Sequence, residues 1–592
     1  MLGTIKARVR LLRLLPRAGG GLAGVLVLLQ LARAAIPTLR ALSVGWLVAS
    51  LGSAGLDQRA LVAAGLVAGV FLFDQLIWLV LTPVTVLAGK RIDGGQRARL
   101  RALAIRLPGL DRLESQTFQD RASRAVDSGM GIARERSAGT AVTGQAELIF
   151  RMVSAFAAAG LLAVFEPALA VGLLVVSLVI RAILRRQWLR IIDRLDADTA
   201  GQRMEFYVAE LAVIGAAKDV RLFGLSDWFG GRFRAAAART YAPVFRELLG
   251  VLRRQWWTAG LLVGAATAAL AFPAAAVLDG GLDPAQLITF VLAAFGVMAI
   301  SNMGMEAYDI EYGLRGIEAA DELNAEHGEA VPVAGREVPG TPTIRFENVV
   351  FSYPGATRPV LDGLSVTLRP GETVAVVGEN GAGKTTFVKL LGGLYRPDSG
   401  RITVDGIDLA DLDLLAWRRR LAVLFQDFVR YPASLRDNVT FAAPEQSNDD
   451  AVLDALDRAG SSDLPAGLDT SLWREGADGT DLSGGQWQRV ALARVLFAVA
   501  AGRRVLVLDE PTAHLDIRAE AEFHERVVSR VHGTTTVLIS HRLSTVRPAD
   551  RIILLRGGRV AEDGTHEELL ALGGDYARFF TVQAETFQAD RP

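Results

Sequence analysis

Two glycine-containing stretches in the second half of the chain have the residue types that bind anions. GENGAGKTT, from Gly378 to Thr386, follows the apolar run TVAVV, and TDLSGGQWQR, from Thr480 to Arg489, precedes a run that is typical of a helix. Free backbone N–H groups at a glycine-rich turn or at a helix N-terminus point towards an anion and bind it. The sequence therefore predicts two separate phosphate-binding segments in one chain.

The first stretch fits the phosphate-binding loop pattern, with Gly378, four intervening residues, Gly383, Lys384 and Thr385. The glycines let successive N–H groups converge on phosphate oxygens. We expect Lys384 to bridge the β- and γ-phosphates of a nucleotide and Thr385 to offer its hydroxyl to Mg²⁺. A plain strand-to-helix turn is the alternative, but such a turn does not require Lys and Thr in this register.

An acidic pair follows a second predicted buried strand. In RRVLVLDEPT the apolar run from Val505 to Leu508 ends at Asp509 and Glu510. An aspartate at a strand end beside the phosphate loop can hold Mg²⁺, commonly through water, because this ion keeps much of its hydration shell. Glu510 is then placed to orient or deprotonate an attacking water. A solvated turn is the alternative for such a pair elsewhere, and the position after a buried strand favours the catalytic role.

These residues belong to the last of three predicted parts of the chain. Residues 343–592 alternate short Val/Ile/Leu strands with helices, which is typical of an α/β domain with a largely parallel sheet. Residues 327–342, HGEAVPVAGREVPGTP, form a polar linker with Pro and Gly. Residues 1–326 hold most of the apolar material and predict an all-helical transmembrane domain.

Composition narrows the classes of function. Hydrophobic residues make up 51% of the 592 residues, and the mean hydropathy of +0.29 is high for a soluble protein. The 64 basic and 64 acidic residues balance, so nothing points to a nucleic-acid partner. The chain has no cysteine, which excludes disulfides, thiolate metal sites and a thiol protease activity carried on this chain.

Six apolar stretches are long enough to cross a bilayer, which needs about 20 residues. They lie at residues 21–51, 61–88, 141–165, 168–183, 258–278 and 287–305. The fourth is short, so it must run on past Arg181. Basic residues from Lys6 to Arg17 predict an amphipathic helix on the inner membrane surface. A signal peptide is the alternative, but the following apolar run is longer than a signal core.

Basic residues also predict the orientation in the membrane. Clusters follow the second span, from Lys90 to Arg101, and the fourth span, from Arg185 to Arg194, whereas the opposite connections hold only Arg59. We therefore expect a multi-pass protein with both chain ends and the α/β domain in the cytoplasm. The abundance of Ala, Arg and Gly suggests a GC-rich bacterium, so the expected membrane is the bacterial inner (plasma) membrane. Polar, helix-like stretches between spans two and three and between spans four and five predict long cytoplasmic hairpins. An ordinary cytosolic loop domain is the alternative.

Ionisable residues inside the predicted spans indicate either a transport cavity or a structural ion pair. Arg33 and Asp74 lie at similar predicted depths, so they could pair with each other. Glu147, Asn302 and Glu306 are further candidates for residues along a pathway. The alternative is an interhelical salt bridge that only orders the helices.

The combination of GENGAGKTT, LSGGQ (Leu482 to Gln486) and VLVLDE resembles the nucleotide-binding domain of ATP-binding cassette (ABC) transporters. The resemblance covers essentially the whole chain, since six spans with two cytoplasmic hairpins before such a domain are similar to a half-transporter of the type IV exporter class. It implies a multidomain membrane protein that is an ATPase coupled to transport, with ATP and Mg²⁺ as cofactors.

The resemblance also implies roles for four further residues. Tyr353 in FSYPG resembles the aromatic residue that stacks on adenine, and Gln426 in LFQDF resembles the glutamine that senses Mg²⁺ and the membrane half. His541 in LISHR resembles the histidine that contacts the γ-phosphate, and Asp516 in PTAHLD resembles the aspartate of the loop that joins the two sites.

Three groups of residues make up the predicted site. The catalytic group is Lys384, Glu510 and His541. The Mg²⁺ group is Thr385, Gln426 and Asp509. The residues expected to contact the nucleotide are Tyr353, Gly378, Asn380, Gly381, Gly383, Lys384, Thr385, Thr386, Gln426, Ser483, Gly485, Gln486 and Asp516.

Two segments depart from the family pattern. Ala513 and His514 stand before Asp516 where the family usually has Ser and Ala, which puts the fine tuning of site coupling in doubt. REGADGTD, before LSGGQ, is only loosely similar to the exporter pattern, so contacts with the partner's helices are expected to differ.

The resemblance explains why one chain has two phosphate-binding segments. In this family the LSGGQ segment of one domain closes over the ATP held by the phosphate loop of another, which implies a dimer. Because Lys384, Glu510, Ser483 and His541 are all present in one chain, both sites of a homodimer would be complete. A heterodimeric partner is therefore not required.

The predicted substrate is a modified peptide. FQDFVRYPASLRDNV and LSGGQWQRVALAR are similar to segments of bacterial exporters of modified peptides such as lantibiotics, in particular those without a peptidase domain. The expected partners are a second copy of the chain, membrane lipid, and a peptide or other amphipathic substrate, with no nucleic acid. Two alternatives stay open: a multidrug or lipid exporter or flippase, and an ATP-gated membrane assembly with a structural or regulatory role.

Overall fold

The computed structural model describes residues 2–54, 57–126, 137–197, 216–302, 304, 306–328, 340–461, 464, 467–473, 479–512, 527 and 533–589. Within these ranges the chain divides into two compact units. We call Met1–Leu103 with Thr117–Gly328 the helical unit, and Ala104–Gln116 with Glu329–Pro592 the sheet unit. The short segment Ala104–Gln116 thus groups with the strands, although it lies within the first part of the sequence.

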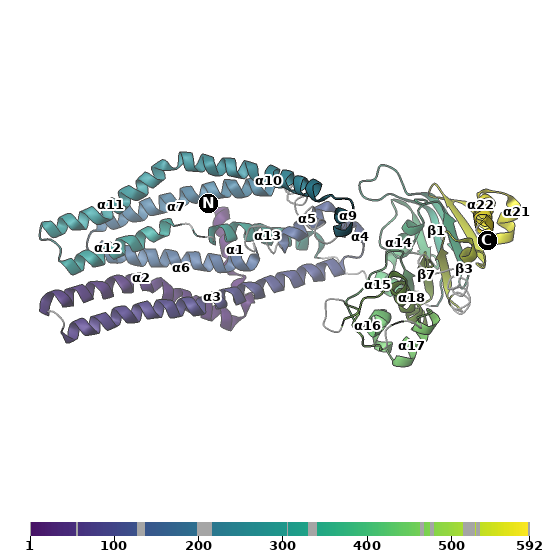
Figure 1. The fold of residues 1–592 in the computed structure, drawn as a ribbon, viewed down its shortest axis with the longest axis horizontal. Helices are drawn as coiled ribbons and strands as arrows, with labels where there is room; N and C mark the ends of the chain where they lie inside the picture. Colours follow the sequence, from purple (N-terminus) through teal and green to yellow (C-terminus); the bar gives the residue numbers. More distant parts are fainter. Residues whose placement is uncertain are drawn as a thin grey trace. The chain divides into compact units, whose positions relative to one another are not determined.

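Among the described residues, the helical unit contains six spans that are long and apolar enough to cross a membrane, as predicted. They lie side by side (Figure 1) and are α2 (Gly20–Ala54), α3 (Gln58–Arg106), α6 (Ala138–Ala163), α7 (Pro167–Ala197), α11 (Trp256–Leu278) and a sixth candidate span at Pro284–His327, which begins with α12 (Pro284–Met298). The shorter or more polar helices are α1 (Leu2–Leu12), α5 (Gln116–Ala125), α9 (Ala217–Leu222), α10 (Ser226–Arg254) and α13 (Glu306–His327). The fourth span does run past Arg181, as expected, and α3 likewise continues from apolar into polar residues without a break.

Small residues let pairs of these helices approach closely. A Cβ added at Gly139 of α6 would lie 2.1 Å from the carbonyl oxygen of Gly89 in α3, and one at Gly45 of α2 would lie 1.9 Å from the hydroxyl of Thr289 in α12. In a bilayer, where no hydrophobic effect drives helices together, such close backbone packing supplies much of the attraction. These glycines therefore fix which faces of the helices meet.

The predicted pairing of Arg33 with Asp74 is wrong. Asp74 pairs with Arg40, whose Nη2 lies 2.7 Å from Asp74 Oδ2, and Arg33 Nη1 instead lies 3.8 Å from Glu147 Oε1. The reason is the register of the α2–α3 hairpin, in which Arg40 and Asp74 are equally distant in sequence from Asp57 at the turn. Arg33 and Arg40 are about two helical turns apart on α2, and counting residues from opposite membrane faces was too imprecise to tell which of them lies beside Asp74.

The sixth span is interrupted. α12 ends at Met298, a 3₁₀ turn covers Ala299–Ser301, and α13 begins at Glu306. Two arginines bond the carbonyl groups at this break: Arg181 reaches the Ile300 and Asn302 oxygens, both at 3.2 Å, and Arg151 reaches the Asn302 oxygen at 3.3 Å. A helix end leaves carbonyls without intrahelical partners, so these guanidinium groups satisfy them.

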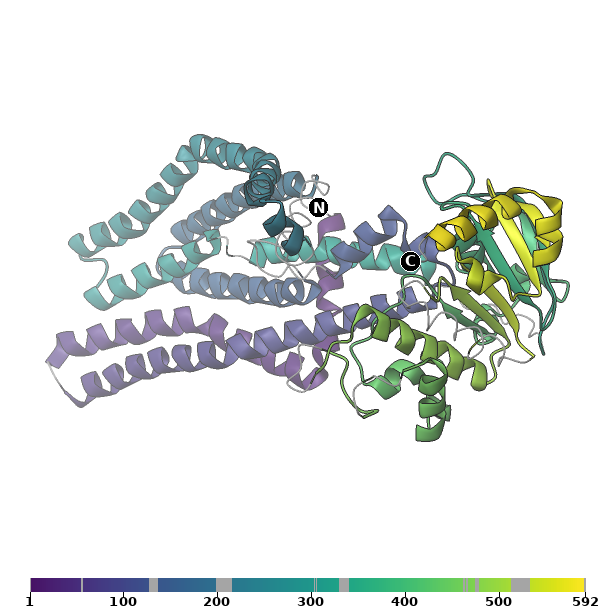
Figure 2. The same cartoon turned by 45° about the vertical axis from the view of Figure 1, so that its right-hand side comes forward.

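The sheet unit contains two sheets (Figure 2). A four-stranded sheet has the order β2–β1–β4–β5, and a six-stranded sheet has the order β10–β9–β3–β8–β7–β6. The strands are β1 (Ile344–Phe351), β2 (Leu361–Leu368), β3 (Thr373–Gly378), β4 (Ser399–Val404), β5 (Ile407–Asp408), β6 (Leu421–Leu424), β7 (Val505–Asp509), β8 (Thr535–Ile539), β9 (Arg551–Arg556) and β10 (Arg559–Gly564). The pairs from β9 through β3, β8 and β7 to β6 are parallel, as predicted, and β10 is antiparallel to β9.

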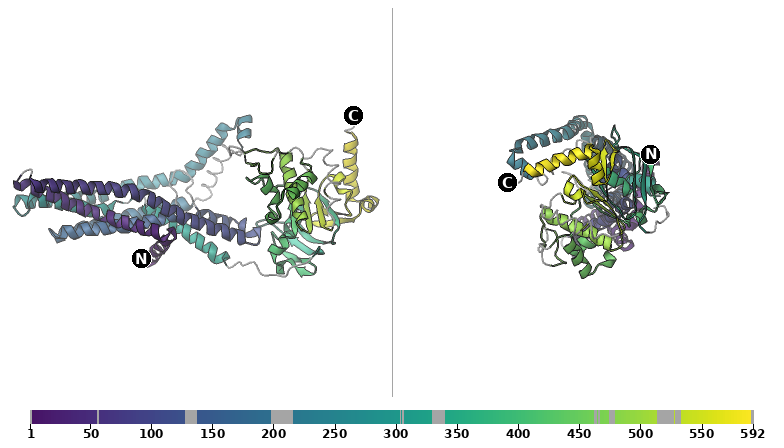
Figure 3. Two further views of the ribbon diagram at one scale, coloured as in Figure 1. Left: turned by 90° about the horizontal axis from the view of Figure 1, so that it is seen from below. Right: turned by 90° about the vertical axis from the view of Figure 1, so that its right-hand side faces the viewer.

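Hydrophobic burial explains this sheet. All residues of β7 and β8 are buried, which suits the apolar runs VLVL and VLI within them, since helices cover both faces of a parallel sheet. The helices of the unit are α4 (Leu110–Leu113), α14 (Lys384–Leu391), α15 (Leu414–Arg418), α16 (Leu435–Thr440), α17 (Asp449–Arg458), α18 (Gly484–Ala500), α20 (Leu543–Val546), α21 (His566–Leu572) and α22 (Asp575–Ala589). The last of them extends away from the strands (yellow in Figure 3).

Candidate active site

The order of the parallel strands brings the predicted site residues to one edge of the six-stranded sheet. β3, β8, β7 and β6 are neighbours, and their carboxyl ends lead into Gly378, His541, Asp509 with Glu510, and Gln426. Carboxyl ends of parallel strands meet at the same edge, which is where such sheets bind ligands. Residues far apart in the sequence are therefore placed around one space.

The phosphate loop requires glycine at its first and last positions. A Cβ at Gly378 would lie 2.4 Å from the carbonyl oxygen of Leu555, and a Cβ at Gly383 would lie 2.5 Å from Leu361 Cδ2. Gly383 also has a φ of +100°, in the left-handed region, and is the N-cap of α14. The loop therefore ends at a helix N-terminus whose first residue is Lys384, which is the arrangement that binds phosphate.

Lys384 is folded into this loop. Its side-chain Nζ lies 2.8 Å from the carbonyl oxygen of Gly378 and 3.0 Å from that of Glu379, and the residue is 8% exposed. Burial lowers the pKa of Lys384, although the carboxylates of Glu510 and Asp509 act in the opposite direction. A phosphate in the loop would supply the negative charge that this buried ammonium group lacks, so the residues fit a nucleotide.

Thr385 and Asp509 lie together at the same edge. Thr385 Oγ1 donates a hydrogen bond to Asp509 Oδ2 over 3.1 Å, and Asp509 is 2% exposed. Burial raises the pKa of Asp509 to about 6; the Thr385 hydrogen bond opposes this shift and the charge of Glu510 adds to it. Two adjacent oxygen ligands, one of them a carboxylate that needs a cation to stay ionised in a buried site, fit Mg²⁺.

Glu510 and His541 face each other. His541 Nδ1 lies 3.3 Å from Glu510 Oε1, and the Glu510 N–H donates to the Ile539 carbonyl over 2.9 Å. Glu510 has a φ of +52°, so a non-glycine residue holds the left-handed conformation directly after a buried strand. This conformation is costly for a side chain of this size and is found most often at functional sites.

Gln488, which the sequence reasoning did not identify as a site residue, supports the Glu510 backbone. The side chain is 3% exposed, and its Nε2 donates to the carbonyl of Pro511 over 2.7 Å and to that of Glu510 over 3.4 Å. It lies on α18, the helix that begins at the LSGGQ segment. A glutamine at a buried position of an otherwise apolar helix face is the signal that could have identified it, since buried amides need partners.

The LSGGQ segment forms the start of α18, as predicted for an anion-binding helix end. Ser483 is the N-cap: its Oγ accepts from the Gln486 N–H over 3.3 Å, and Gln486 Oε1 accepts from the Ser483 N–H over 3.0 Å. Ser483 is exposed, and Gly485 is the second residue of the helix. This capping box leaves the helix end at the surface, where a second chain can reach it.

The other residues implied by the resemblance differ in their surroundings. The Tyr353 hydroxyl lies 3.1 Å from Thr386 Oγ1, which ties this ring to the phosphate loop, and Lys389 Nζ lies 5.2 Å from the ring centre. Gln426 is exposed after β6, and Asn380 and Gly381 are exposed in the loop. Asp516 lies outside the described residues. Their roles stay predictions.

The segment Ala104–Gln116 packs against the same unit near the Tyr353 ring. The Leu110 N–H donates to the Leu394 carbonyl over 2.8 Å, and the Tyr395 hydroxyl donates to Glu114. Burial, with the Glu114 carboxylate, raises the pKa of Tyr395. The Tyr395 ring packs edge-on against Tyr353, with centroids 5.4 Å apart. This chain of contacts runs from α4 to the phosphate loop.

Comparison with known proteins agrees with this geometry. Residues 361–513 match the family model described as "ABC transporter". The chain is 32% identical over 387 residues to the ATP-dependent lipid A-core flippase of Methylobacillus flagellatus, covering 64% of this chain and 63% of that protein. It is 43% identical over 250 residues to the mycobactin import ATP-binding/permease protein IrtB of Mycolicibacterium thermoresistibile, covering 41% of each chain.

The alignments with these relatives span roughly two fifths to two thirds of their length. A solved structure, described as a bacterial Atm1-family ABC exporter with ATP bound, superposes over 96% of this chain and 98% of that chain with a TM-score of 0.70 and 24% identity. Residues 361–513 therefore match the family model of ABC transporters, and the fold of the chain, with six candidate membrane spans among the described residues, is similar to that of the solved exporter.

Proposed function

We propose that this chain is one half of an ATP-driven membrane transporter that works as a homodimer. The observation that carries the proposal is the meeting of Lys384, Asp509 and Glu510 at one sheet edge, in a chain with six candidate membrane spans. An ATPase site of this kind supplies energy, and the spans supply a route across the bilayer.

The residues at the sheet edge divide the work of hydrolysis. Lys384 and the loop N–H groups bind the phosphates and offset their charge. Thr385 and Asp509 would hold Mg²⁺, which would supply further positive charge to the phosphates when bound. Glu510 orients the attacking water and accepts its proton, and His541, 3.3 Å from that carboxylate, positions it. Most of the rate enhancement comes from positioning and charge, as is usual in phosphoryl transfer.

Dimer formation is proposed because each chain has two unlike half-sites. The phosphate loop lies at the sheet edge, whereas Ser483 is exposed at the start of α18. In the proposed dimer the α18 N-terminus of one copy covers the nucleotide on the phosphate loop of the other, with its N–H groups directed at the phosphates. Neither copy completes a site alone.

An anionic amphipathic molecule is the proposed substrate, and a lipid is favoured over a peptide. In the ion-pair network inside the helical unit, the arginines Arg33, Arg151 and Arg181 share the two carboxylates Glu147 and Glu306, so these five residues carry net positive charge. Charged groups in a membrane are costly and tend to face a cavity. The relatives are named for lipid A-core flipping and for mycobactin import, and neither name mentions a peptide.

Reconstituted protein tests this proposal. Proteoliposomes that contain fluorescent phosphatidylglycerol should show ATP-dependent movement of the label between leaflets, measured by chemical quenching of the outer leaflet. A labelled cationic peptide should not move. Movement of the peptide alone would support the predicted peptide exporter. If the lipid, the peptide and a fluorescent dye tested in the same way all fail to move, an ATP-gated assembly is the remaining function.

Glu510→Gln tests the catalytic step separately from nucleotide binding. The variant should bind ATP normally and lose turnover by about two orders of magnitude or more, since a general base contributes roughly 10²–10⁴-fold. Lys384→Ala should instead weaken nucleotide binding, measured with a fluorescent ATP analogue. Wild-type turnover in Glu510→Gln would remove Glu510 as the base, and unchanged affinity in Lys384→Ala would remove its phosphate contact.

A further inference from the structure

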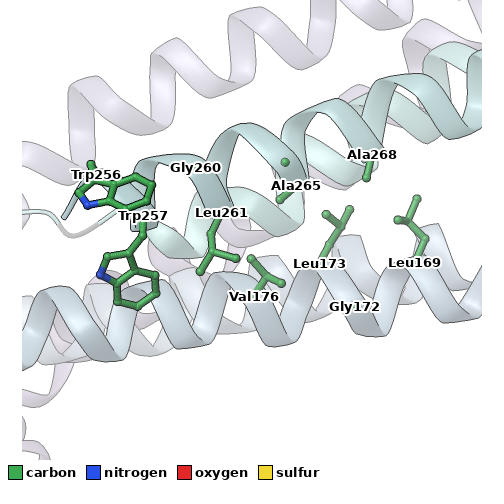
Figure 4. Close-up of a pocket in the computed structure, with 11 residues that line it drawn as sticks. Leu169, Gly172, Leu173, Val176, Trp256, Trp257, Gly260, Leu261, Ala265 and Ala268 are labelled. Carbon is green, nitrogen blue, oxygen red and sulfur yellow. The ribbon is translucent and has the colours of Figure 1, made fainter. Parts of the chain in front are cut away.

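An apolar groove of about 750 Å³ lies between α7 and α11 (Figure 4). Two stripes at helical spacing face each other across it. Leu169, Leu173 and Val176 lie on α7, and Leu261, Ala265 and Ala268 lie on α11. Since residues three and four apart share one face of a helix, each stripe is continuous, and the groove follows both helices.

Glycines keep the groove open. Gly172 of α7 and Gly260 and Gly264 of α11 line it, and a Cβ added at any of the three would meet no atom within 4 Å. Elsewhere in the helical unit, glycines allow backbones to touch, as at Gly139 and Gly89. Here they leave open space between α7 and α11.

The surroundings specify hydrocarbon as the occupant. The groove lies within two candidate membrane spans, Pro167–Arg190 and Trp256–Leu278, and its lining side chains are apolar or tryptophan. α11 is the least buried of the six candidate spans, with 11% of its apolar window buried, so most of this helix faces the bilayer or another chain. A bilayer fills such a surface with acyl chains, because water and polar groups are excluded from that depth.

One end of the groove has the residues of a membrane interface. Trp256 and Trp257 line this end and are 76% and 44% exposed, and tryptophan prefers the level of lipid headgroups. Arg253 is exposed one turn earlier, and Gln255, between α10 and α11, has an amide Nε2 that is buried without a hydrogen-bond acceptor among the described residues. A cation and a free donor suit the phosphate and ester oxygens of a lipid.

The length of the groove fits one chain of one leaflet. From Trp256 to Ala268 the α11 axis rises about 18 Å at 1.5 Å per residue. Half of a typical hydrocarbon core is about 15 Å. A chain that enters beside the tryptophans therefore reaches the far end of the groove near the bilayer midplane.

We propose that the groove between α7 and α11 is a binding site for one acyl chain of a resident membrane phospholipid, with its phosphate group at Arg253 and Gln255. The lipid fills the space that Gly172, Gly260 and Gly264 leave, and it joins α11 to α7 at the α10–α11 junction. This inference concerns a bound lipid and not the transported molecule, so it does not depend on the proposed substrate.

Native mass spectrometry of the full-length protein with added phosphatidylglycerol tests the site. The double variant Gly172→Leu/Gly264→Leu places bulk in the groove, and a Cβ at either position meets no atom within 4 Å. Its affinity for the most tightly bound phosphatidylglycerol should fall about tenfold or more, because displacing about two methylene groups from an apolar site is enough for that change. The control is Gly65→Leu/Gly69→Leu on α3, where an added Cβ also meets no atom within 4 Å, and it should bind as the wild type does.

Arg253→Ala provides a second measurement that leaves the groove intact. It should weaken phosphatidylglycerol binding several-fold and leave binding of a neutral diacylglycerol unchanged. Equal lipid binding in the wild type, Gly172→Leu/Gly264→Leu and Arg253→Ala would overturn the proposal. Loss of dimer cross-linking in the groove-filled variant, with lipid binding unchanged, would assign the groove to a second copy of the chain instead.

Discussion

Asp509 and Glu510 are adjacent in the sequence but have different environments. Asp509 is 2% exposed at the end of β7 and bonds to Thr385, which suits a carboxylate that holds a cation. Glu510 turns into the left-handed region, with its carboxylate beside His541, which suits a group that exchanges a proton with water. The change of backbone conformation between the two residues would separate the proposed Mg²⁺ ligand from the proposed catalytic base.

The raised pKa of Asp509 predicts that Mg²⁺·ATP binding depends on pH. The pKa of Asp509 in the folded protein is about 6, above its ordinary value of 3.8, so the side chain stays protonated up to about pH 6, and Mg²⁺ needs the ionised form. The KM for Mg²⁺·ATP should therefore rise as the pH falls below 6, by up to about tenfold per pH unit. Steady-state kinetics at a fixed Mg²⁺·ATP composition from pH 5 to pH 7.5 would measure this dependence.

The same shift has the opposite sign for the stability of the nucleotide-free protein. The folded state binds the Asp509 proton more tightly than the unfolded state does, so this residue makes the free energy of unfolding fall as the pH rises from 3.8 to about 6. Asp509→Asn cannot ionise and should remove this part of the pH dependence. A KM that is constant down to pH 5 in the wild type would contradict the role of Asp509.

Single residues of the site could be predicted where a motif fixes their spacing. Gly378, Lys384, Asp509 and Glu510 all follow buried strands, and the structure places them at one sheet edge. Gln488 could not be found in this way, because its partners are the carbonyls of Glu510 and Pro511, which come from a distant strand end. Side-chain contacts to backbone carbonyls leave little trace in residue spacing.

At the scale of elements, α4 and the residues after α14 are joined by polar contacts. Arg418 donates to the carbonyls of Pro108, Gly392 and Gly393, and the Tyr395 hydroxyl donates to Glu114. Since α3 continues from the second membrane span into Ala104–Gln116, we propose that these noncovalent contacts couple that span to the ATP site. Tyr395 also touches Tyr353, beside the phosphate loop.

Tyr395→Phe should weaken this coupling without removing the ATPase. The ring and its packing stay, so nucleotide affinity should remain within about twofold, but Glu114 loses a donor at a cost of about 1–3 kcal/mol. We expect the stimulation of ATPase activity by phosphatidylglycerol to fall several-fold, measured in proteoliposomes. Tyr431→Phe removes a hydroxyl elsewhere in the sheet unit and should leave the stimulation unchanged. Equal stimulation in the wild type and Tyr395→Phe would exclude this path.

The regular elements could be predicted and the breaks between them could not. Apolar runs predict β3, β7 and β8 because each is buried on both faces. The break between α12 and α13 falls inside an apolar run, so hydropathy does not reveal it. The break is tolerated because Arg151 and Arg181, from other helices, donate hydrogen bonds to its carbonyls. Hydropathy records how apolar a segment is, not whether its helix is continuous.

At the scale of the whole molecule, the six spans were predicted because hydrocarbon thickness fixes their length. The ion-pair partners of the charged residues inside the spans were not predicted correctly: Asp74 pairs with Arg40 and not with Arg33. Helix register and rotation decide such pairs, and a depth count fixes neither. The dimer likewise rests on Ser483 being exposed and on the family resemblance.

Mixed dimers should reveal whether Ser483 acts on its own chain or on the other. A dimer of one Lys384→Ala copy with one Ser483→Arg copy has both defects in the same proposed site, so the second site is intact. We expect ATPase activity up to about half of wild type, since one of two sites can still perform the chemistry. Two affinity tags select the mixed dimers before the assay.

The control pairs a Lys384→Ala/Ser483→Arg copy with a wild-type copy. Each proposed site then has one defective half, so activity should fall to background. If each chain instead completes its own site, the two results exchange places. This reversal would refute the face-to-face arrangement.

The interrupted sixth span has a mechanical consequence. Guanidinium groups from α6 and α7 hold the Ile300 and Asn302 carbonyls, so three membrane helices are fastened at one level by hydrogen bonds. If α6 and α7 move apart, either Arg151 or Arg181 must lose its hydrogen bond, and a carbonyl left without a partner in hydrocarbon costs about 1–3 kcal/mol. Intermediate positions of the helices leave such a carbonyl without a partner. The helices should therefore occupy a few discrete arrangements instead of a continuous range. The free energy needed to break these hydrogen bonds sets the barrier between the arrangements.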